Sequence, residues 1–209
     1  MTAPSLPESL TLAPEYDQPV HYIERTRSWY QALGYPNAYR WAHFVEVPFT
    51  PLRKPLAHCC VAFVTTAARY QSDKGPQGPG APYNAAAKFF SVYSGDTALE
   101  HDLRISHVAI DRVHTSMEDS RCWSPLEALR TMVGTGRIGS LAMRFHGAPT
   151  NRSQRHTLEV DCPEILRCCK DDGVDAAILL PNCPVCHQTL SLVARGRRQG
   201  SQRSDATDQ

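Results

Sequence analysis

The sequence lacks the features of membrane-spanning, secreted and nucleic-acid-binding proteins. No apolar run approaches the ~20 residues that a membrane span requires, and residues 1–20 hold neither the basic nor the apolar segment of a signal peptide. The formal net charge is only +1, which gives no indication of nucleic acid or an anionic membrane as a partner. We therefore expect a cytoplasmic protein.

Metal-binding patterns are scarce as well. Among 8 cysteines only Cys183-Pro-Val-Cys186 forms a CxxC, and the chain contains neither a second CxxC nor an HxxxH. Structural zinc needs a second ligand pair, so no metal ligand set is predicted, and a zinc site would have to start from Cys183, Cys186 and His187. In the absence of a signal peptide, the cysteines indicate reduced thiols rather than a disulfide framework.

The composition fits one sizeable domain. With 209 residues, of which 42% are hydrophobic, we predict an α/β fold, a Rossmann-like three-layer domain with a mostly parallel sheet and an extended N-terminal arm. The expected parts are a flexible tail (1–20), an N-terminal helix with an aromatic and proline-rich arm (21–57), the α/β domain (58–196) and a disordered polar tail (197–209).

Apolar runs and turn residues predict the main elements. Strands are expected at 60–67, 103–111 and 176–180, with a strand or loop at 137–146 and a long loop at 71–84. Helices are expected at 21–33, from a capping box at Ser124 to near Gly134 or Gly136, from Asp161 to Cys169, and after the CxxC.

The CxxC lies where the strand 176–180 passes into the last predicted helix. Backbone N–H groups at a helix start stabilise an anion, so a thiolate at Cys183 or Cys186 is favoured. A redox or catalytic pair is the main interpretation. Half of a zinc site and a purely structural pair of buried thiols are the alternatives.

Polar side chains also gather where the other predicted strands end. Thr65 and Thr66 are candidate substrate contacts, although β-branched residues also simply finish strands. At the end of the second strand and beyond it, imidazole and carboxylate groups could bind a metal, provide acid–base chemistry or bind substrate, while any one of them alone fits a cap or a surface charge. These candidates are His107, Asp111, His114, Glu118 and Asp119.

Four stretches together resemble a known family. They are Val61–Ala67, Ile105–His114, Gly136–Gly139 and, as the most specific, Asp172–Gln188 with its CxxC-His. The chain resembles the selenoprotein B family of glycine, sarcosine, betaine and D-proline reductases, and within it the D-proline reductase (PrdB-like) branch. In selenium-dependent members, selenocysteine occupies the position that matches Cys183.

The resemblance implies an oxidoreductase that reductively cleaves a C–N bond of a small amino acid or amine. Cys183 would attack carbon, Cys186 would resolve the adduct, and His187 would belong to the catalytic motif. The resemblance also implies a partner subunit that carries a pyruvoyl group; a homo-oligomer is the other assembly considered. A thiol–disulfide redox protein and a zinc protein remain the alternative functions.

Overall fold

The computed structural model describes residues 21–37, 40–45, 50–78, 81, 84–105, 107, 118–151 and 153–205, with backbone only from 197 onward. The chain divides into two compact units, Met1–Tyr39 and Arg40–Gln209. The first unit contains α1 (Tyr22–Ala32), as the sequence predicts, and Gly34 follows it with a positive φ of 81°. Only glycine adopts this backbone conformation without strain, which accounts for the end of the helix.

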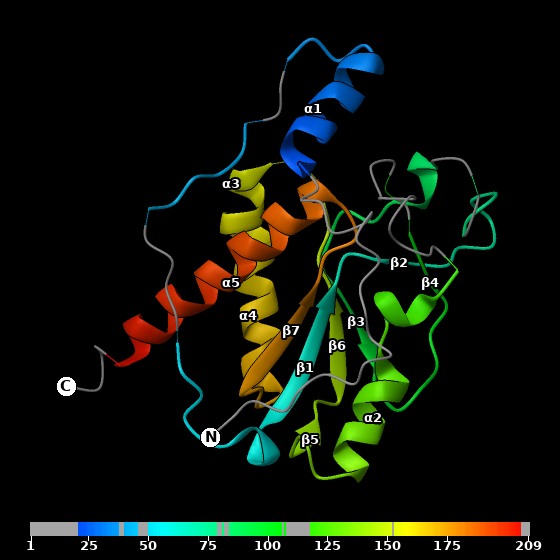
Figure 1. The fold of residues 1–209 in the computed structure, drawn as a ribbon. Helices are drawn as coiled ribbons and strands as arrows, with labels where there is room; N and C mark the ends of the chain where they lie inside the picture. The colour runs from blue at the N-terminus through cyan, green and yellow to red at the C-terminus, as the bar shows by residue number, and fades with distance from the viewer. Residues whose placement is uncertain are drawn as a thin grey trace, which may run out of the picture. The chain divides into compact units, whose positions relative to one another are not determined.

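The second unit is built on a five-stranded sheet (Figure 1). Its strands are β1 (Cys60–Thr65), β3 (Tyr93–Asp96), β5 (Ser140–Leu141), β6 (Arg144–Gly147) and β7 (Ala176–Leu180). The central strand β1 runs parallel to β5, β6 and β7, and β3 pairs antiparallel with β6. The mostly parallel α/β fold predicted from the sequence is confirmed.

Alternate residues of β1 pack against opposite layers. Val61 and Phe63 belong to a core cluster with Leu126 and Leu129 of α2 (Leu126–Gly134), and the Phe63 ring stacks on Phe145. Val64 lies in the other cluster, whose members come from α4 (Cys162–Asp171) and α5 (Pro184–Asp205). Figure 1 shows α4 and α5 on one side of the sheet and α2 on the other. Burial on both faces explains why β1 is a continuous apolar run.

The second predicted strand does not join this sheet in the part that the structure describes. Leu103–Arg104 form β4, which pairs antiparallel with β2 (Ala68–Arg69) in a separate two-stranded sheet. Strands of the main sheet come instead from residues 93–96 and 140–147. Strand propensity indicates that a segment is extended but does not select its partner, so the expected membership of the main sheet is wrong for Leu103–Arg104. Residues 106 and 108–111 of this predicted strand lie outside the described residues.

The remaining elements are short, apart from the helices around α4. Single turns form η3 (Leu56–His58), η4 (Ala85–Ala87) and η5 (Ser120–Cys122). A three-residue α3 (Gln154–His156) and a π-helical η6 (Thr157–Asp161) precede α4. The capping box predicted at Ser124 is wrong, because Pro125 precedes α2 and makes no side-chain cap. α5 extends through Asp205, past the start of the predicted polar tail.

Three parallel strands end at the same level of the sheet. Thr65 of β1 is in register with Leu180 of β7 on one side and with Gly147 of β6 on the other. The segments that follow these strands therefore meet at the carboxyl edge, where ligands bind in open α/β sheets. Of the helices described here, none has the length and apolar character needed to cross a lipid bilayer.

Candidate functional site

The CxxC lies at this edge, at the start of α5. Cys183 directly precedes the first helical residue, Pro184, and forms a disulfide with Cys186. The backbone N–H of Cys186 donates a hydrogen bond to Cys183 Sγ over 3.1 Å. Cys183 is 5% exposed and Cys186 is fully buried. In the reduced state, the same N–H and the helix dipole would stabilise a thiolate at Cys183.

His107 lies beside the two sulfurs. One of its ring nitrogens and both Sγ atoms all lie within 4.8 Å of one another. His107 Nε2 is 3.1 Å from the carbonyl oxygen of Thr66, an arrangement in which the ring N–H donates and the carbonyl accepts. His107 thus offers a ring nitrogen beside the two sulfurs that can exchange a proton or ligate a metal ion.

The two threonines predicted as substrate contacts lie at the end of β1: Thr65 is its last residue, Thr66 follows it, and both are fully buried. Thr66 Oγ1 accepts a hydrogen bond from the backbone N–H of Asn182 over 3.0 Å, which ties this loop to the turn that carries Cys183. Thr65 Oγ1 accepts one from Ala67 N–H over 3.2 Å. Both hydroxyls therefore have structural partners: the Thr66 bond joins the end of β1 to the turn after β7, whereas the Thr65 bond stays within the turn after β1.

A third segment reaches the site from β6. Thr150, which is buried, donates its hydroxyl to Cys186 Sγ over 3.5 Å. The preceding Ala148 N–H donates to Thr65 O over 2.8 Å, which fixes this loop to β1. A Cβ at Gly147 would overlap the Tyr93 ring, so only glycine allows β6 to end here. Sequence reasoning did not single out Thr150, because its role depends on the pairing of β6 with β1.

The other predicted site residues differ in their surroundings. His187 is exposed, and its Nδ1 donates to the carbonyl oxygen of Cys183 over 3.0 Å, one turn back along α5. Asp119 accepts hydrogen bonds from the backbone and guanidinium of Arg121 and caps η5. Asp111 and His114 lie outside the described residues. Within the described ranges, the histidine that groups with both sulfurs is therefore His107 rather than His187.

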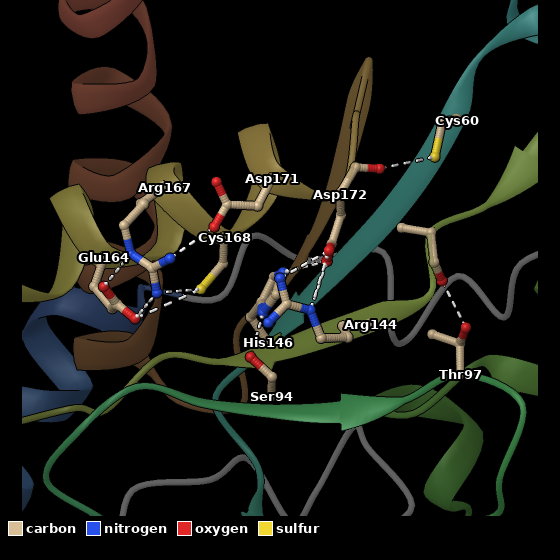
Figure 2. Close-up of polar contacts among 11 residues, drawn as sticks. Cys60, Ser94, Thr97, Arg144, His146, Glu164, Arg167, Cys168, Asp171 and Asp172 are labelled. Carbon is tan, nitrogen blue, oxygen red and sulfur yellow. Dashed lines mark hydrogen bonds and ion pairs between the residues drawn. The ribbon is translucent and has the colours of Figure 1, made fainter.

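A second polar cluster contains serine, histidine and aspartate (Figure 2). Ser94 Oγ lies 2.9 Å from His146 Nδ1, and Asp172 Oδ2 lies 3.7 Å from His146 Nε2. The His146 side chain is fully buried, and burial lowers its pKa below the usual 6.5. Arg144 holds the Asp172 carboxylate with bonds of 2.7–3.1 Å.

This cluster lies away from the CxxC. Asp172 precedes β7, whereas Cys183 follows it, so the two sites adjoin opposite ends of the same strand. Cys60 Sγ also contacts the Asp172 carbonyl oxygen at this amino end. With a buried histidine and an aspartate paired to arginine, the cluster stabilises the junction of α4, β6 and β7.

Comparison with curated proteins identifies one related subunit. Over 152 residues, 70% of this chain, the sequence is 32% identical to D-proline reductase subunit gamma of Acetoanaerobium sticklandii. The chain is similar in sequence to that gamma subunit over this range. It spans 58% of the relative's length. The resemblance to the D-proline reductase branch inferred from the sequence motifs is thereby confirmed.

No family model matches the chain, and no solved structure matches it. The homologue is named as one subunit of a reductase, which supports a reductase-like function in broad terms.

Proposed function

We propose that this D-proline reductase homologue is a subunit of an oxidoreductase that cleaves a C–N bond of a small amino acid or amine. The observation that carries the proposal is the Cys183–Cys186 pair at the carboxyl edge, with the Cys183 sulfur at a helix start and His107 beside it. A dithiol there can supply the two electrons that reductive cleavage consumes.

The chemistry balances within this pair. The Cys183 thiolate attacks the carbon, a C–S bond forms, and the C–N bond breaks as the amine leaves with a proton. Cys186 then attacks the Cys183 sulfur, the disulfide forms, and the released carbon takes the second proton. His107, whose Nε2–H is held by the Thr66 carbonyl, is placed to accept and return a proton. An external reductant restores the dithiol.

The amine must also be activated, because a neutral amine is a poor leaving group. The family resemblance assigns this task to a pyruvoyl group on a partner subunit, and the name of the relative as a gamma subunit supports an assembly of several chains. We therefore propose that this chain contributes the redox pair and that its partner contributes the pyruvoyl group.

The test uses the complex isolated through a tag on the full-length chain. With D-proline and dithiothreitol, cleavage of the ring C–N bond yields 5-aminopentanoate, which is measured by mass spectrometry. Cys183→Ser should abolish turnover, whereas Cys186→Ser should allow at most one turnover and leave an adduct visible in the intact mass. Full activity of Cys183→Ser would refute the mechanism. Reduction of insulin disulfides without D-proline cleavage would favour the thiol–disulfide protein instead.

Zinc binding is the second candidate function, and the position of His107 favours it. When reduced, Cys183 and Cys186 provide two thiolates, and His107 provides a third ligand atom within 4.8 Å of both. Three protein ligands with an open fourth position are typical of catalytic zinc sites. The bond from His107 to the Thr66 carbonyl is the kind of outer contact that orients a ligating imidazole.

Two histidine variants test the zinc site. Titration of the reduced chain with Zn²⁺ against a chromophoric chelator should show that His107→Ala loses about tenfold or more in affinity. His187→Ala is the matched control, because His187 bonds to the Cys183 carbonyl and lies outside the group of three. Equal affinity of both variants and the unaltered chain would exclude His107 as a ligand.

A further inference from the structure

Thr150 is the residue that the structure connects directly to the second cysteine of the pair. Its hydroxyl donates to Cys186 Sγ over 3.5 Å, and the threonine is 5% exposed. Cys183 Sγ accepts from a different donor, the backbone N–H of Cys186, over 3.1 Å. Each sulfur therefore has its own hydrogen-bond donor: a backbone N–H at the helix start for Cys183 and a side-chain hydroxyl for Cys186.

The loop that carries Thr150 is fixed on both sides of this residue. Before it, Ala148 N–H donates to a carbonyl oxygen of β1 over 2.8 Å, and Pro149, whose ring restricts the backbone, is fully buried. After it, the side-chain amide of Asn151 donates to the buried carboxylate of Asp161 over 3.4 Å. The threonine hydroxyl is thus held in place beside the sulfur by the loop that follows β6.

A thiolate at Cys186 needs such a donor. Cys186 is fully buried, so water does not reach its sulfur, and its own backbone N–H is directed at Cys183. Burying a charge without a hydrogen bond is costly, whereas a hydrogen bond to the ionised form of a group favours that form. The Thr150 hydroxyl supplies this hydrogen bond to the second sulfur.

We infer that Thr150 is a positioning residue for the second half of the reaction, in which it stabilises the Cys186 thiolate that releases the adduct from Cys183. The inference rests on the proposed function for the identity of the adduct. Cys186 attacks the Cys183 sulfur, the disulfide forms, and the released group leaves with the electron pair and takes up a proton. Without the hydroxyl a smaller fraction of Cys186 is ionised, so this step slows, while the attack by Cys183 depends on the helix start and does not.

A small uncharged reagent, hydroxyethyl disulfide, tests this role on the reduced full chain. Cys183 attacks the reagent and one mercaptoethanol leaves; Cys186 then displaces the second mercaptoethanol from Cys183. After an acid quench, peptide mapping separates the dithiol, the Cys183 mixed disulfide and the Cys183–Cys186 disulfide, so one peptide gives both rate constants. Thr150→Val should slow the second step by about threefold to tenfold and leave the first unchanged, so that the mixed disulfide accumulates.

A pH profile and a rescue separate this role from a structural one. The second rate constant rises with pH as Cys186 ionises, and Thr150→Val should shift that rise to higher pH. Thr150→Ser keeps a hydroxyl and should restore both the rate and the profile. Thr97→Val is the matched control and should change neither step, because this buried threonine donates its hydroxyl to the Ala142 carbonyl oxygen over 2.6 Å, near the start of β6 (Figure 2).

Two results would overturn the inference: a second rate constant in Thr150→Val equal to that of the unaltered chain, or an equal fall of both rate constants. If the reagent does not reach the buried pair, D-proline turnover by the complex decides. Thr150→Val should then accumulate the Cys183 adduct in the intact mass, and absence of the adduct would refute the inference. The proposed function fails on a different result, in which the complex does not cleave D-proline although exchange with hydroxyethyl disulfide depends on Thr150.

Discussion

Replacing Thr66 by valine removes the bond that joins the loop after β1 to the turn carrying Cys183. Valine has nearly the same shape, so the fully buried side chain keeps its packing while the Asn182 N–H loses its acceptor at 3.0 Å. Leaving a buried donor unpaired costs about 1–3 kcal/mol, and the half-buried position of Asn182 places this case at about 1–2 kcal/mol. For a chain of this size we expect Tm to fall by about 2–8 °C.

Urea denaturation of the reduced full chain measures this loss. Thr131→Val is the matched control, because Thr131 bonds to the Glu127 carbonyl on the exposed surface of α2, and it should change stability by less than about 0.5 kcal/mol. Alkylation of Cys183 should also slow in Thr66→Val, since the sulfur is no longer held at the helix start. Equal stability of the two valine variants would show that the Thr66 bond does not align the site.

Further predictions concern pH and packing. Burial lowers the pKa of His146 below 6.5, so below that pH the unfolded chain binds a proton at this residue that the folded chain does not bind. The free energy of unfolding should therefore fall as pH drops below 6.5. In urea titrations, His146→Gln should reduce this pH dependence. Burial raises the pKa of Asp161 above 3.8, so the ionised carboxylate destabilises the fold at neutral pH. Asp161→Asn should therefore raise the free energy of unfolding at pH 7. A lower free energy of unfolding in this variant would contradict a destabilising role for the carboxylate. Gly147→Ala should lower the free energy of unfolding by about 1–3 kcal/mol or more, because the added Cβ would overlap the Tyr93 ring. Gly134→Ala, which has open space around its Cα, should leave the melting temperature unchanged or raise it.

Local patterns determined several elements on their own. The sequence alone indicates strands at the apolar runs 60–65 and 176–180. It also indicates that a helix begins at the CxxC. The helix around Cys162–Asp171 follows from Pro163 at its start and from Gly173, whose φ is 65°, after its end. Backbone hydrogen bonds within a few residues create these signals, so neighbouring side chains suffice to encode them.

The tertiary structure alone decided which segments meet. Residues 140–147 join the sheet and residues 103–104 do not, because strand pairing depends on partners distant in the chain. The pairing of β6 with β1 brings Thr150 to Cys186. His107 lies beside both sulfurs although it follows β4 of the smaller sheet, while His187 bonds to the Cys183 carbonyl at the start of its own helix. The sequence by itself determined the two cysteines and the helix whose start stabilises a thiolate. The residues around the cysteines depend on three strand ends that align at Thr65, Gly147 and Leu180. No local spacing encodes this long-range arrangement.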